Sequence, residues 1–196
     1  SQPIMYRDYS LSVAETASTF FEQVTAERIR DMLPKKDRII MLHKEIAKDI
    51  STIFLQIACF NFENELHLRI RKEGELAAAD MAALMRKHMG AYAGPVVTMT
   101  EKDGYSFVNW SHIRNMFYVY TYAYGQLVSK SLFARWKKDA SFAIKIRQFL
   151  KAGSSDTPEN IFKSIGIDVK DPAFFEDGLK EIERSIEEVE RLTTRK

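Results

Sequence analysis

The 196-residue sequence has one cysteine, five prolines, eight glycines and almost no excess of charge of either sign. The lone Cys59 cannot form an internal disulfide, so a reducing compartment, the cytoplasm, is expected. The 29 basic and 27 acidic residues leave a net charge of +2, which predicts neither a nucleic-acid partner nor a membrane partner. No apolar run approaches the ~18 residues that a membrane-spanning helix needs. Disordered, collagenous and disulfide-stapled classes are excluded.

The length predicts one domain, residues 1–196, with a core of ordinary size. The chain begins Ser1-Gln2-Pro3 without a methionine and soon enters a helical pattern. This start is expected either of a piece of a longer protein or of a processed terminus or tag remnant, and the sequence alone leaves both open.

Apolar residues at helical spacing predict an all-α fold of long antiparallel helices. Ser10, Thr157 and Asp171 are predicted N-caps, the last two with proline at the first helical position. The predicted helices cover residues 10–33, 37–73, 75–92 and 139–152, with shorter or later ones after Thr157 and Asp171. Residues 93–107 are the longest predicted loop.

The segment 110–136 allows two interpretations. Its tyrosines alternate with Val119, Thr121 and Ala123, and this alternation alone would favour a strand. The continuation over residues 126–133 suits a helix better, so a helix is predicted, and a strand here would contradict the all-α fold.

Two groups of side chains could carry chemistry. Glu15 and Glu22 are seven residues apart, so both carboxylates project from one helix face, as an oxygen ligand for a metal requires. The alternative is a solvated acidic face. His112 precedes a run of tyrosines and could stabilise an oxyanion together with them. The alternative is a satisfied histidine among core aromatics.

A third group, Phe60, Glu63 and His67, shares one helix face, and we interpret it as packing. Cys59 lies on an apolar face, where an inert core thiol is typical. The sequence has no H-E-x-x-H motif, glycine-rich phosphate loop or cysteine cluster, so no complete active site can be assembled from it.

Four segments, in order, resemble the oligoendopeptidase F family of zinc metallopeptidases, relatives of thimet oligopeptidase. The segments that carry the resemblance are Ala14–Glu22, Gln56–His67, His112–Ala123 and Phe149–Asp168. The resemblance extends from residue 1 to about residue 180. It implies that this all-α chain is part of a zincin-like helical peptidase catalytic domain.

The resemblance also implies roles for individual residues. Glu15 corresponds to the third zinc ligand, and the H-E-x-x-H helix that supplies the others would lie before Ser1. His112, with one or two tyrosines for which Tyr120 and Tyr122 are the candidates, would hydrogen-bond the oxyanion and the substrate backbone. The implied function is a cytoplasmic zinc endopeptidase acting on short, unfolded peptides, of which this chain is the carboxyl-terminal part.

The alternative function is a non-catalytic helical interaction module, in which Glu15, His112 and the tyrosines would lie on separate surfaces. For the chain alone we expect no catalysis and weak zinc binding, because it offers one of the three protein ligands that a catalytic zinc needs. Self-association through an apolar face left exposed by truncation is a further expectation.

Overall fold

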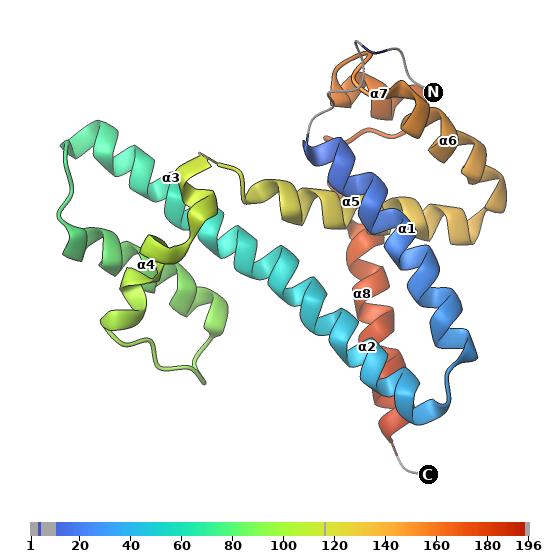
Figure 1. Cartoon of the computed structure of the whole chain (residues 1–196), viewed down its shortest axis with the longest axis horizontal. Coiled ribbons are helices and arrows are strands. Elements are labelled where there is room, and N and C mark those ends of the chain that lie inside the picture. Colours follow the sequence, from blue (N-terminus) through green and yellow to red (C-terminus); the bar gives the residue numbers. More distant parts are fainter. Residues whose placement is uncertain (1–3, 5–10, 116, 195–196) are drawn as a thin grey trace. The chain divides into compact units, whose positions relative to one another are not determined.

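The computed structural model describes residues 4, 11–115 and 117–194 (Figure 1). They are helical with no strand among them, which confirms the all-α prediction. The chain divides into two compact units, Ser1–Asp49 with Tyr124–Lys196, and Ile50–Ala123. Each unit is described by itself. The predicted cap Ser10 lies outside the described residues.

Long helices build the first unit. They are α1 (Leu11–Met32), α2 (Lys35–Ile50), α5 (Tyr120–Lys138), α6 (Ala143–Ala152), α7 (Pro158–Ser164) and α8 (Pro172–Thr193), of which α2 and α5 each have one end in the second unit. The two predicted N-caps that lie within the described residues, Thr157 and Asp171, are confirmed. Thr157 Oγ1 accepts a hydrogen bond from the Asn160 N–H at 3.3 Å, and Asp171 Oδ1 accepts one from the Ala173 N–H at 3.0 Å.

The core of the first unit is aromatic and draws on α1, α5, α6, α7 and α8. Its buried members are Phe20, Val128, Leu132, Phe133, Phe142, Ile146, Phe149, Ile161, Phe162, Ile165, Ile167 and Phe174. The helix α8 approaches the backbone of α5 at Gly178, where a Cβ atom would lie 2.7 Å from the Leu127 carbonyl oxygen. This close packing requires glycine at that position.

Among its described residues, the second unit has a π-helical turn, two α-helices and two 3-10 segments. In chain order they are a π-helical turn η2 (Ser51–Leu55), α3 (Gln56–Glu73), α4 (Ala78–Ala93), η3 (Lys102–Asn109) and η4 (Ser111–Asn115). Their core consists of Ala58, Cys59, Phe62, Leu66, Leu84, Met85, Met89 and Val119. The predicted helix over residues 37–73 is confirmed, with the π turn as the part that periodicity does not reveal.

The segment before α5 differs from the prediction. The helix begins at Tyr120 and not at Trp110, and residues 111–115 form a 3-10 turn. Phe117, with φ of 55°, lies in the left-handed region and ends any regular helix there. The predicted loop 93–107 contains the start of η3, where Asp103 Oδ2 accepts the Thr100 N–H at 2.7 Å. Single 3-10 turns are too short for a periodicity to show.

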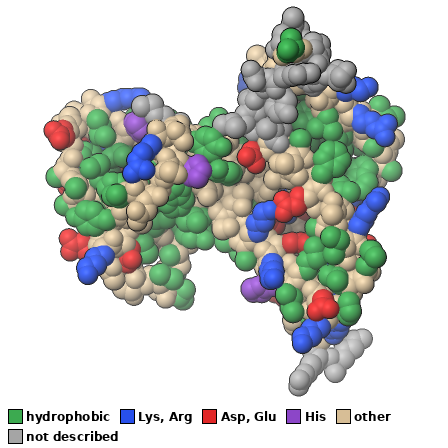
Figure 2. Space-filling model, in the orientation of Figure 1, with side chains coloured by type: hydrophobic (Ala, Val, Ile, Leu, Met, Phe, Trp, Pro, Cys, Tyr) green, Lys and Arg blue, Asp and Glu red, His purple; other side chains and the backbone are tan. Residues whose placement is uncertain are grey.

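The hydrophobic side chains are not all buried. On the face that Figure 2 presents, they form several patches between the charged side chains. In the first unit, Phe21 and Ile29 of α1 are 53% and 44% exposed. With Met41 of α2 they line an apolar groove between the two helices. No helix within the described residues is long and apolar enough to cross a membrane.

The approach of α1 to α5 is set by Gly125. A Cβ atom there would lie 2.8 Å from the Cβ of Glu15 and 3.6 Å from its carbonyl carbon. Real Cβ atoms do not come so close, so any other residue at position 125 would displace this turn of α1. Gly125 therefore determines how close the Glu15 backbone lies to α5.

We expect Gly125→Ala to lower the free energy of unfolding by about 1–3 kcal/mol, because the added methyl group overpacks the contact with Glu15. Gly90→Ala is the matched control. It also lies in a helix, but its added Cβ meets only Met99 Cγ, at 3.8 Å, so the better helix propensity of alanine should stabilise it by up to about 1 kcal/mol. Urea denaturation of the two variants measures the difference, and equal shifts would show that the contact at Gly125 is not tight.

Candidate active site

The structure brings His112 and two tyrosines together in the second unit. A hydrogen bond of 3.0 Å joins the Tyr122 hydroxyl to Nε2 of His112. The Tyr118 ring stacks on the imidazole with 5.3 Å between ring centroids, and it meets the Tyr122 ring edge-on at 5.4 Å. All three side chains are half-buried. His112, Tyr118 and Tyr122 thus form one cluster of polar aromatic side chains in this unit.

Tyr120, the other predicted tyrosine, lies apart from this cluster. Its ring meets Phe60 edge-on at 6.1 Å and is 46% exposed. The structure therefore pairs His112 with Tyr122 and adds Tyr118, which the sequence analysis did not single out. Tyr118 precedes the first residue of α5, so helical spacing gives no guide to its direction.

Glu63 of α3 is fully buried directly beside this cluster. Its Oε1 accepts a hydrogen bond from the Phe117 N–H. The Phe117 ring contacts His67, with centroids 5.0 Å apart, and Phe60 at 6.0 Å. The helix face of Phe60, Glu63 and His67 that we interpreted as packing is thus in contact with the turn between His112 and Tyr118.

Glu15 lies in the first unit, on α1, and is half-buried. Among the described residues, none forms a hydrogen bond or ion pair with its carboxylate. Its carbonyl oxygen accepts hydrogen bonds from Thr19 Oγ1 at 2.6 Å and Ser18 Oγ at 3.1 Å. Glu22, its predicted companion, instead forms an ion pair with Lys48 of α2.

The described part of the chain contains no group of three His, Cys, Asp or Glu side chains that could hold a metal ion. Cys59 does not compensate for this, because burial, and to a smaller extent the nearby Glu63, raise its pKa to about 12. Its thiol is protonated at neutral pH and is neither a nucleophile nor a ligand.

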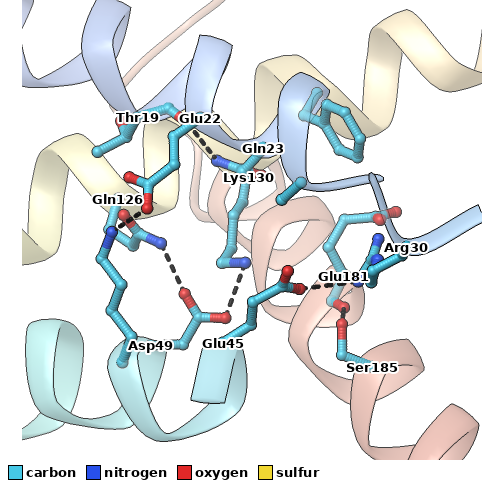
Figure 3. A pocket seen from close by; sticks show the side chains of 13 residues that line it. Thr19, Glu22, Gln23, Arg30, Glu45, Asp49, Gln126, Lys130, Glu181 and Ser185 are labelled. Carbon is cyan, nitrogen blue, oxygen red and sulfur yellow. Dashed lines mark hydrogen bonds and ion pairs between the residues drawn. The ribbon is translucent and has the colours of Figure 1, made fainter. Parts of the chain in front are cut away.

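A polar cavity of about 60 Å³ lies within the first unit, between α1, α2, α5 and α8 (Figure 3). At its centre, Lys130 Nζ forms an ion pair with Asp49 Oδ2 at 2.8 Å, and Gln126 Nε2 donates to Asp49 Oδ1 at 2.6 Å. All three residues are buried. A compensated pair of this kind fixes the relative position of α2 and α5.

Arg30 and Glu45 form a second pair at the same cavity, 2.9 Å apart. Burial raises the pKa of Glu45, against the lowering effect of Arg30 and Lys130. The cavity walls carry four acidic and three basic side chains: Glu22, Glu45, Asp49 and Glu181, with Arg30, Lys48 and Lys130. This balance of charges favours a structural role. In the sequence Lys130 stands between Ser129 and Ser131, and no local pattern reveals its partner Asp49.

The all-helical fold agrees with the fold that the resemblance to helical peptidases implies. Residues 1–181 match peptidase family M3, and the chain belongs to that family.

The chain is similar to oligopeptidase PepF of Bacillus subtilis (strain 168), with 29% identity over 97% of the chain and 29% of the relative. It is 27% identical to an oligoendopeptidase F homolog of Borreliella burgdorferi, over 98% of the chain and 33% of the relative. The chain thus spans about a third of the length of these relatives.

The fold is shared with two solved structures. A crystal structure of oligoendopeptidase-F from Enterococcus faecium superposes with a TM-score of 0.84 at 24% identity, covering 94% of this chain and 36% of that one. A putative peptidase from Chlamydophila abortus gives a TM-score of 0.88 at 24% identity, covering 97% and 32%. At these identities the similarity shows the fold alone.

We expect Lys130→Met to lower the free energy of unfolding by about 3–5 kcal/mol, because it leaves the Asp49 carboxylate buried without its cation. The double variant Lys130→Met/Asp49→Leu should recover most of this loss, since neither charge is then left unpaired. Urea denaturation of the single and double variants gives the coupling energy.

The control is Lys48→Met, which removes a half-exposed partner of Glu22 at the rim of the same cavity and should cost about 1 kcal/mol or less. A similar cost for Lys130→Met and Lys48→Met would contradict the assignment of Lys130 and Asp49 as the pair that holds α2 against α5.

Proposed function

We propose that this chain is the carboxyl-terminal part of a zinc-dependent metalloendopeptidase of the cytoplasm that hydrolyses short, unfolded peptides. The observation that carries the proposal is the hydrogen bond between His112 and Tyr122, in a chain whose first 181 residues match peptidase family M3. The names of its relatives, oligopeptidase and oligoendopeptidase, support peptides as the substrate class.

Glu15 is the residue of this chain that would hold zinc. Carboxylate oxygen is a suitable zinc ligand, and the half-buried carboxylate on a rigid helix fits that role. The remaining protein ligands are proposed to be two histidines of an H-E-x-x-H helix that precedes this chain in the longer protein. When bound, zinc supplies a water of lowered pKa and polarises the peptide carbonyl.

His112 and Tyr122 are proposed to stabilise the oxyanion that forms when the peptide carbonyl is attacked. When Nε2 carries the proton of the neutral imidazole, it donates to the Tyr122 oxygen, and we propose that the phenol O–H donates to the oxyanion during the reaction. Such donors lower the barrier only if they are already in place before the reaction. The stacked Tyr118 ring restricts the imidazole to one orientation.

Tyr120 is proposed to contact the substrate backbone. Its exposed ring packs on Phe60 and not on the histidine, so its hydroxyl is suited to a bound peptide and not to supporting His112. This divides the predicted catalytic set into an oxyanion pair, His112 and Tyr122, and a peptide-binding phenol.

The groove of Phe21, Ile29 and Met41 between α1 and α2 is proposed to be covered by other parts of the longer protein. In the 196-residue chain alone, we propose that this apolar face drives self-association. The alternative function, a non-catalytic interaction module, predicts neither zinc binding nor turnover by the longer protein.

In the protein encoded by the complete gene, we expect Glu15→Gln to lose zinc and activity together. His112→Ala and Tyr122→Phe should retain zinc and lose kcat by about 10²–10³, as removal of an oxyanion donor does in other enzymes. Zinc content by atomic absorption and hydrolysis of a fluorogenic peptide measure the two properties separately. Tyr120→Phe is the matched control for Tyr122→Phe and should raise KM more than it lowers kcat. Loss of zinc from the His112 variant would refute this division of roles.

The 196-residue chain by itself should bind zinc no more tightly than micromolar and should not hydrolyse peptides, because Glu15 is a single ligand. Calorimetric titration with zinc and the same peptide assay test this, and submicromolar binding or turnover would contradict it. Sedimentation should show self-association that Phe21→Glu reduces, whereas a monomer at all concentrations would argue against an exposed docking face.

A further inference from the structure

Glu63 is a buried carboxylate for which the proposed reaction has no direct use. It lies on α3 between core residues such as Phe62 and Leu66, and none of its surface is exposed. Burying a carboxylate is costly unless hydrogen bonds compensate it. Its Oε1 accepts a hydrogen bond from the backbone N–H of Phe117, 54 residues further along the chain, whereas its Oε2 has no hydrogen-bond partner among the described residues. This hydrogen bond joins α3 to the turn that precedes α5.

The residue that donates this hydrogen bond, Phe117, has a strained backbone. Phe117 has φ of 55°, a left-handed conformation that is unfavourable for a bulky side chain. Such conformations cost about 1–3 kcal/mol and persist only where the surroundings enforce them. The hydrogen bond to Glu63, together with the ring contacts to Phe60 and His67, provides that enforcement.

The strained residue lies between the two parts of the His112 cluster. Phe117 follows His112 and directly precedes Tyr118, and α5 with Tyr122 begins three residues later. Its backbone conformation therefore sets the direction in which both tyrosines leave the turn. A relaxed, right-handed Phe117 would redirect Tyr118 and Tyr122 away from the imidazole.

We propose that Glu63 is a positioning residue: by accepting the Phe117 N–H, it holds this turn in the left-handed conformation that keeps Tyr118 and Tyr122 against His112. An effect of Glu63 on catalysis rests on the proposed function, whereas its effect on the conformation of Phe117 does not. The proposal requires an acceptor atom at this position and does not require a charge.

The test compares variants that keep or remove this acceptor. In Glu63→Gln an amide oxygen can still accept the Phe117 N–H, whereas in Glu63→Leu a side chain of similar size cannot. We expect nuclear Overhauser contacts between the His112 and Tyr122 rings, and the ¹⁵N shift of His112 Nε2, to be retained by the glutamine variant and lost in the leucine variant. Loss in both, or retention in both, would overturn the proposal.

A second change separates positioning from general stability. Glycine adopts the left-handed region readily, so Glu63→Leu/Phe117→Gly should regain the His112–Tyr122 contacts that Glu63→Leu loses. Leu66→Ala, which truncates a buried residue one turn further along α3, is the matched control and should lower stability while leaving those contacts intact. Loss of the contacts in Leu66→Ala, or no recovery in the double variant, would show that Glu63 merely supports the fold.

One measurement needs no variant. The Phe117 amide proton of the 196-residue chain should exchange slowly with solvent and resonate far downfield, because it donates to a buried carboxylate. Rapid exchange would overturn the proposal even if Glu63→Leu does not fold.

In the longer protein, Glu63→Leu should lower kcat about tenfold or more with KM changed less, and Glu63→Gln should restore most of it. If that protein has no peptidase activity at all, the proposed function fails, while the ring contacts still decide the role of Glu63.

Discussion

The close packing of α5 is the constraint on which the rest of the structure depends. This helix begins with Tyr120 and Tyr122, meets Glu15 through the missing side chain of Gly125, and then places Lys130 against Asp49. At Leu127 and Ser131 its backbone is approached by Gly178 of α8. A change in its position would thus affect the candidate ligand and the α8 contact together. This close packing requires glycine at positions 125 and 178.

Two buried carboxylates illustrate different ways of using charge in a core. Asp49 is compensated by a full positive charge, so the pair holds two helices together but is sensitive to loss of either partner. Glu63 accepts one backbone N–H, that of Phe117, and under the proposal above it acts on the conformation of that single residue. The first arrangement stabilises a helix contact, and the second determines where neighbouring side chains point. Both carboxylates thus act through the positions of other residues and not through contact with a substrate.

The elements that could be predicted from the sequence are those whose cause is local. The spacing of apolar residues gave the long helices, and Thr157 and Asp171 marked their starts, because a cap depends on atoms two or three residues away. The turn before α5 could not be predicted in this way. Its conformation depends on Glu63, which is distant in sequence, and no propensity assigns a left-handed conformation to phenylalanine.

The same reason explains the partial prediction of the candidate site. The resemblance makes Tyr120 and Tyr122 the candidate tyrosines. The structure separates them, because a helix that begins at Tyr120 points residues two apart in different directions. Tyr118 joins His112 because it lies in the turn and not in the helix. The Asp49–Lys130 pair also links distant segments, so no local pattern in the sequence indicates it.

The geometry also bears on the order in which a site of this kind is assembled. The contact between His112 and Tyr122 is formed by residues of the second unit, and under the inference above the turn at Phe117 holds it. Donors that are in place before charge develops cost little reorganisation during the reaction. A zinc site, by contrast, requires more ligands than Glu15 provides. Under the proposed function, the second unit therefore supplies oxyanion donors that are already in contact, whereas the zinc ligands other than Glu15 come from the longer protein.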